Sequence, residues 1–144
     1  MSQTKDVFVV GAARTAIGTY GGTLKDTPLS ELATLAVKTA LARSGADAAR
    51  IGHLAMGTVI PTEPRDAYLS RVAAVQAGLP NETPAFNVNR LCGSGLQAII
   101  SASQAIMLGD CEMAIGAGAE SMSRGAYLMP NARWGARMGD TQVL

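Results

Sequence analysis

The sequence has few aromatic side chains, few charges and few of the residues that bind metals. Phe, Trp and Tyr make up 4% of its 144 residues, and charged residues make up 16% with a formal net charge of +1. Because the basic residues are scattered, we expect neither a nucleic-acid partner nor attraction to an anionic membrane surface. One histidine and two cysteines without ligand spacing predict no metal site.

Long apolar runs and leader-like segments are also missing. We expect no membrane-spanning helix, because no run approaches the roughly 20 apolar residues that such a helix needs. The N-terminus starts with polar residues and has no small-residue cleavage site after a long apolar stretch. Cys92 and Cys111 do not form the even multi-cysteine pattern of a secreted protein. These absences predict a cytoplasmic protein with free thiols and no membrane partner.

The sequence is rich instead in small aliphatic residues and glycine. Hydrophobic residues account for 48% of the chain, and there are 16 glycines, which is typical of helices packed closely on a sheet. Strand-like and helix-like segments alternate in the order βαβαβαβ. The predicted strands are 7–13, 53–60, 85–91 and 112–118, and the predicted helices are 27–45 with Thr27 as N-cap, 66–80 and 94–110. This alternation predicts an α/β fold with ligands beyond the carboxyl ends of the strands.

Cys92 is the residue whose local sequence most clearly suggests chemical reactivity. It stands in NVNRLCGSGLQAI, between a predicted strand and the start of an apolar helix. The N–H groups of a first helical turn stabilise a thiolate, and Gly93 and Gly95 leave room for a thioester and its oxyanion. Cys92 is therefore a candidate acyl acceptor, with backbone support from Cys92 itself and Gly93. The alternative is a small buried side chain that packs at a strand–helix corner.

The other reactive side chains lack such a setting. Cys111 follows a predicted helix end and begins a strand, which favours a packing role. His53 stands at a strand edge with no nucleophile nearby in sequence, which favours a structural or solvent-exposed role. Ser94 does not complete a G-x-S-x-G pattern and is expected to form hydrogen bonds in the first helical turn. GAGAES at 116–121 matches a dinucleotide fingerprint only in part, because Ser121 replaces the third glycine.

Three motifs together resemble the thiolase family, the acetyl-CoA C-acetyltransferases and β-ketothiolases. They are AARTAIGTYGGTL at 12–24, VNRLCGSGLQAI at 88–99 and GAGAESMS at 116–123, and the second is highly specific. The similarity covers the whole chain and is greatest to bacterial biosynthetic enzymes. One departure is Ala16, where thiolases often have proline.

The resemblance implies a thiolase-like fold in which this chain is the N-terminal βαβαβαβ half, with a mixed sheet between helices. It assigns residues 1–121 to that half-domain. Residues 122–144, which show no helix or strand period, would begin the loop domain that holds much of the coenzyme A. A homodimer or homotetramer is also implied.

The implied activity is the reversible Claisen condensation of two acyl-CoA molecules to a 3-ketoacyl-CoA, through an acyl-thioester on Cys92. Coenzyme A thioesters are then substrates, and no cofactor is bound covalently. The family also uses a histidine in a Gly-His-Pro motif and a cysteine in a Cys-x-Gly motif, which His53 and Cys111 do not match. We therefore expect the chain alone to be inactive. The alternatives are a ketoacyl-synthase-like condensing enzyme and a non-catalytic α/β oligomerisation module.

Overall fold

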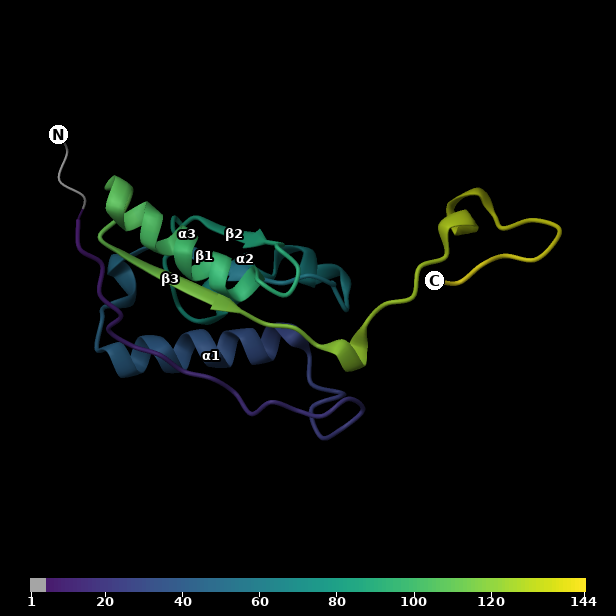
Figure 1. The fold of residues 1–144 in the computed structure, drawn as a ribbon, viewed down its shortest axis with the longest axis horizontal. Coiled ribbons are helices and arrows are strands. Elements are labelled where there is room, and N and C mark those ends of the chain that lie inside the picture. The colour runs from purple at the N-terminus through teal and green to yellow at the C-terminus, as the bar shows by residue number, and fades with distance from the viewer. Residues whose placement is uncertain (1–4) are drawn as a thin grey trace.

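A computed structural model describes residues 5–144 and has helices on both faces of a small parallel sheet (Figure 1). The elements are α1 (Leu29–Ser44), β1 (Ile51–Gly57), α2 (Leu69–Gln76), β2 (Ala85–Val88), α3 (Ser94–Leu108) and β3 (Met113–Gly118). The strand order is β2-β1-β3, and β1 is parallel to both neighbours. The predicted α/β class is confirmed.

Side chains of the central strand alternate between the two helical layers. Leu54 and Met56 of β1 belong to a buried apolar cluster with residues of α1 and α2. The intervening Ala55 is also fully buried, and Gly57 lies directly against the start of α3. Because successive strand residues point to opposite faces, α1 and α2 cover one face and α3 covers the other.

The two faces of α3 differ in the size of their side chains. Its buried apolar residues are Ala98, Ala102 and Ala105, whose spacing places them on one stripe of the helix. Larger apolar residues are exposed on the rest of its surface, namely Leu96, Ile99, Ile100, Met107 and Leu108. The window Leu91–Leu108 has a hydropathy of 1.4, so by length and composition alone it could cross a membrane. The prediction that no apolar run is long enough to span a membrane is therefore wrong for this window, although α3 packs on the sheet.

The predicted first strand, residues 7–13, does not form. Among the described residues the sheet contains only parallel pairs, so the expected mixed sheet is not observed either. The segment instead runs along α1 (Figure 1), and Arg43 donates a hydrogen bond to the Ala12 carbonyl oxygen at 3.0 Å. Phe8 and Val9 are 78% and 84% exposed. An apolar run acquires strand structure only when a neighbouring strand pairs with it, and no described strand pairs with this segment.

Several element boundaries also differ from the predictions. Pro28, not Thr27, occupies the N-cap position of α1, and no side chain caps that end. β1 ends at Gly57. The Thr58 N–H still donates to the Val88 carbonyl oxygen of β2 at 3.2 Å, whereas the N–H groups of Val59 and Ile60 donate to the Glu120 carboxylate and not to a strand. The predicted helix 66–80 is shorter, since a 3-10 turn at Pro64–Tyr68 precedes α2.

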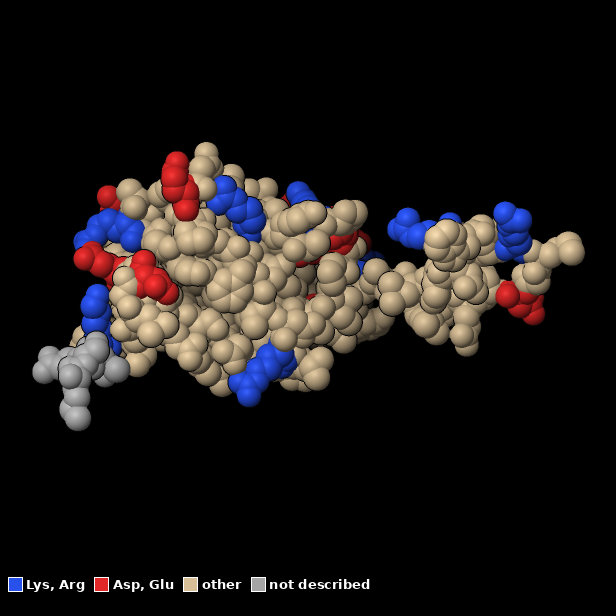
Figure 2. Space-filling model, turned by 90° about the horizontal axis from the view of Figure 1, so that it is seen from above, with Lys and Arg blue, Asp and Glu red and all other residues tan. Residues whose placement is uncertain are grey.

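The last part of the chain projects away from the sheet and helices (Figure 1). It contains 3-10 turns at Met122–Arg124 and Pro130–Trp134. Backbone hydrogen bonds join Leu128 and Leu144 in both directions, at 2.7 and 2.8 Å. Basic and acidic side chains are interspersed on the face in Figure 2, and some basic groups lie on this projection. The boundary between 1–121 and 122–144 stays a prediction.

Candidate active site

Cys92 lies at the carboxyl edge of the sheet, in the turn between β2 and α3. The strand ends are level there, because Gly57 of β1 is paired in register with Val88 of β2 and Gly118 of β3. The thiol is free and exposed, which contradicts the alternative of a buried packing residue. The side chain is therefore accessible to a substrate at the edge where ligands of parallel α/β sheets bind.

The start of α3 leaves one backbone donor open at Cys92. Gly93 is the N-cap residue, and no side chain caps the helix there. The N–H of Gly93 donates to the Arg90 carbonyl oxygen at 3.1 Å, and that of Ser94 donates to Leu91 at 3.0 Å. Within residues 5–144 the Cys92 N–H donates to no protein acceptor. Of the two proposed oxyanion donors, the N–H of Cys92 is available and that of Gly93 is already bonded.

Glycines of β1 and β3 allow α3 to approach the sheet closely. A Cβ atom at Gly57 would lie 2.4 Å from the Ser94 carbonyl carbon, and one at Gly116 would lie 2.6 Å from the Ile99 Cα atom. Both distances are far below ordinary carbon contacts of about 3.5–4.0 Å. Only glycine fits at these positions, and the start of α3 rests on them. Sequence reasoning missed this role, although the glycines of the 116–123 motif were a signal for it.

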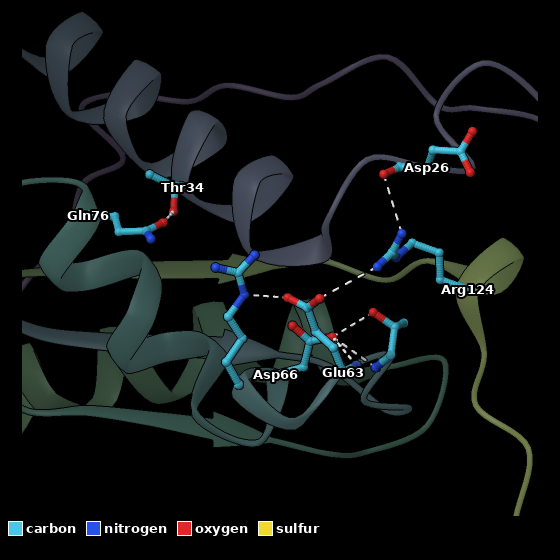
Figure 3. A network of polar contacts seen from close by, with 8 residues as sticks. Asp26, Thr34, Glu63, Asp66, Gln76 and Arg124 are labelled. Atoms are coloured by element: carbon cyan, nitrogen blue, oxygen red, sulfur yellow. Dashed lines mark hydrogen bonds and ion pairs between the residues drawn. The ribbon is translucent and has the colours of Figure 1, made fainter.

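A polar network joins the loops that follow β1 and β3 (Figure 3). Arg124 donates to the Asp26 carbonyl oxygen at 3.3 Å and lies 3.5 Å from the Glu63 carboxylate. Asp66 is fully buried, and its Oδ2 atom accepts hydrogen bonds from both Thr62 donors and from the Glu63 N–H. Arg124 therefore joins loops of the protein in this structure, as a structural residue.

The motif at 116–123 contacts both of the other motifs. Gly118 lies beside Gly95 of α3, since a Cβ atom there would be 3.2 Å from the Gly95 Cα atom. Ser123 accepts a hydrogen bond from the Gly21 N–H at 2.9 Å, across 102 residues of sequence. The three stretches quoted from the sequence therefore meet at one edge of the sheet. The spacing of these motifs in the sequence does not predict that they lie side by side, which only the fold shows.

A hollow beside the end of β3 does not contain Cys92. It has a volume of about 450 Å³ and lies among residues 13–20, Leu32 and Ala36 of α1, and residues 118–123. The hollow is an open space between the N-terminal segment and the end of β3.

His53 and Cys111 lie away from Cys92. His53 is four residues before the end of β1, which is about 13 Å along a strand, and its ring stacks edge-on against Phe86 at 5.3 Å. Cys111 follows the carboxyl end of α3, and Gly52 packs so closely that a Cβ there would be 2.6 Å from the Cys111 Cβ. Burial, with a contribution from Asp110, raises the pKa of the Cys111 thiol. The structure supports packing roles for both.

Comparison with known proteins decides the family. The sequence model described as the thiolase N-terminal domain matches residues 7–144. The chain belongs to the thiolase family. It is 61% identical to β-ketothiolase BktB of Cupriavidus necator over 141 residues, which are 98% of this chain and 36% of that protein.

Thiolases from other organisms match over the same region. The mitochondrial 3-ketoacyl-CoA thiolase of Homo sapiens is 39% identical over 139 residues, which are 96% of this chain and 35% of that protein. The crystal structure of human mitochondrial 3-ketoacyl-CoA thiolase gives a TM-score of 0.89 at 39% identity and covers 94% of this chain and 34% of that one. The chain spans about a third of the length of these relatives. The resemblance drawn from the three motifs is confirmed.

Proposed function

We propose that this chain supplies the nucleophile of a thiolase that condenses acyl-CoA molecules reversibly to 3-ketoacyl-CoA. The single observation that carries the proposal is the exposed Cys92 thiol at the uncapped N-terminus of α3, in a chain of the thiolase family. The relatives are named β-ketothiolase and 3-ketoacyl-CoA thiolase, and their names supply the substrate class.

In the first step the Cys92 thiolate attacks the carbonyl carbon of an acyl-CoA. The Sγ–C bond forms, the C–S bond to coenzyme A breaks, and coenzyme A leaves with the proton that Cys92 gave up. Negative charge develops on the thioester oxygen during the attack. The open N–H of Cys92 and the positive end of the α3 dipole stabilise that charge.

In the second step an acetyl-CoA deprotonated at its methyl carbon attacks the acyl-thioester. A C–C bond forms, the Sγ–C bond breaks, and the Cys92 thiolate is restored as 3-ketoacyl-CoA leaves; thiolysis is the reverse. His53, the sole histidine of the sequence, lies too far along β1 to act as the base for Cys92. The proton acceptor and most of the coenzyme A site therefore come from outside residues 1–144, and the chain alone is inactive in condensation. Association into a dimer or tetramer is part of the same proposal.

The experiment uses a chimera in which residues 1–144 are followed by the remaining part of the Cupriavidus necator β-ketothiolase. The expected results are acetoacetyl-CoA thiolysis by the chimera, its loss in Cys92→Ser, and its retention in the control Cys111→Ser. An active Cys92→Ser chimera contradicts the proposal. If acyl groups come only from carrier-protein thioesters and never from acyl-CoA, the enzyme is ketoacyl-synthase-like. A folded chimera without any acyl transfer shows a non-catalytic module.

A further inference from the structure

The residue before Cys92 has an unusual backbone conformation. Leu91 has a φ of +50°, in the left-handed region that costs an ordinary residue free energy because its Cβ atom crowds the following carbonyl oxygen. Its side chain is 70% exposed, so burial of the leucine does not offset this cost. Hydrogen bonds or packing around the turn must hold the conformation.

Two side chains bind the peptide groups on either side of Leu91. The Ser94 hydroxyl accepts a hydrogen bond from the Arg90 N–H at 2.8 Å and donates one to the Leu91 carbonyl oxygen at 2.6 Å. The Asn89 Oδ1 atom accepts from the Leu91 N–H at 3.0 Å. The Ser94 hydroxyl thus closes a ring across the turn that presents Cys92, and Asn89 supports it from the other side.

Ser94 is itself held rigidly by the sheet. Its side chain is 4% exposed, and its backbone rests on Gly57, where a Cβ atom would come within 2.4 Å of the Ser94 carbonyl carbon. The Ser94 hydroxyl therefore fixes the turn at Leu91 relative to the end of β1. Cys92 does not fix its own position in this way, because its side chain is exposed and its backbone N–H forms no hydrogen bond among the described residues.

We propose that Ser94 is a positioning residue of the thiolase site, which holds Leu91 in the left-handed conformation and thereby aims the Cys92 thiol and N–H at the substrate. The inference rests on the proposed function of Cys92 for its catalytic consequence. Ser94 touches no reacting atom, and it acts by keeping the Cys92 Sγ and N–H atoms in the geometry that the acyl-transfer step needs. Asn89 contributes to the same geometry but is exposed, so its substitution should destabilise the fold less than substitution of the buried Ser94.

The first test measures the turn itself in the 144-residue chain. Amide hydrogen exchange of Arg90 and Leu91 reports the two hydrogen bonds directly. Ser94→Ala is expected to accelerate exchange at Arg90 at least tenfold, and Asn89→Ala to accelerate exchange at Leu91 similarly. The control is Ser103→Ala, which removes a hydroxyl bonded to the Ile99 carbonyl oxygen on the same helix and should leave both amides unchanged. Unchanged exchange at Arg90 in Ser94→Ala overturns the inference.

The second test separates positioning from general destabilisation, in the chimera described above. Ser94→Ala should lower kcat at least tenfold with KM within twofold, and Asn89→Ala should lower it less. Asn89→Asp, which keeps the acceptor oxygen, should restore kcat. Adding Leu91→Gly to Ser94→Ala should also recover most of kcat, because glycine adopts a positive φ without strain. A normal kcat in Ser94→Ala, or no recovery in the double variant, overturns the positioning role.

The two proposals fail in distinguishable ways. If Cys92→Ser keeps its activity, the proposed function is wrong, while the exchange rates still decide whether Ser94 and Asn89 hold the turn. If Cys92→Ser is inactive and Ser94→Ala is fully active, only the positioning inference is wrong.

Discussion

Replacing Gly57 with alanine tests how closely α3 rests on the sheet. The new Cβ atom would lie 2.4 Å from the Ser94 carbonyl carbon and 2.6 Å from the Gly95 nitrogen. Ordinary contacts between such atoms are about 3.5 Å or more, so the strand end and the helix must separate by about 1 Å. Both neighbours are backbone atoms, and no side-chain rotation can relieve the overlap. Overpacking of this kind costs about 1–3 kcal/mol.

Urea unfolding of the 144-residue chain measures this cost. Gly57→Ala should lower the midpoint at an unchanged slope, because the same surface is exposed on unfolding. The matched control is Gly95→Ala, at the residue that follows Ser94, where a Cβ atom meets nothing within 4 Å. Gly95→Ala should not destabilise the chain, and its gain should stay below the value of about 0.5–1 kcal/mol that separates alanine from glycine in the middle of a helix, because Gly95 lies in the first turn. A Gly57→Ala chain as stable as the unsubstituted chain would refute the close contact.

Three further predictions follow from buried or exposed groups. Because burial raises the pKa of Cys111, iodoacetamide should alkylate Cys111 more slowly than Cys92 at neutral pH. The alkylation rate of Cys111 should increase as the pH rises. Equal rates for the two cysteines at neutral pH, measured by peptide mass spectrometry, would contradict this prediction. Asp66→Ala leaves two backbone N–H groups without their acceptor, so urea unfolding should show a loss of about 2–3 kcal/mol, and a negligible loss would mean that the network is dispensable. We expect the exposed apolar side chains near Val9 to make the chain self-associate. Val9→Lys should then reduce self-association in sedimentation without changing stability, and unchanged association would show that this segment does not form the contact.

The helices and central strands were predictable because their sequence patterns are local. α1 ends at Ser44 and is capped by Gly45 in the left-handed conformation, as the glycine in the sequence indicates, and α3 begins at Ser94, as predicted. The segment 7–13 has an equally clear strand composition but no strand structure. A strand forms only when a second strand pairs with it, and the sequence of an apolar run does not show whether such a strand is present among the described residues.

The position of Cys92 at a helix start was predictable from the sequence, but the contacts that hold the turn around it were not. A cysteine at a glycine-flanked helix start indicates a reactive thiol through the helix dipole, and the exposed position agrees with that prediction. The conformation of Leu91 and the bonds made by Ser94 involve neighbours within five residues, yet leucine carries no signal for a positive φ. The contact of Gly57 with Ser94 joins residues 37 positions apart, and only the fold brings them together.

The most direct test of the central claim is site-resolved mass spectrometry of the chimera after incubation with acetyl-CoA. The account predicts one acetyl group, located on the peptide that contains Cys92, which free coenzyme A removes by thiolysis. The acetyl group should be absent in Cys92→Ser and present in Cys111→Ser. Acetylation of another residue, or labelling that persists in Cys92→Ser, would contradict the assignment of Cys92 as the nucleophile.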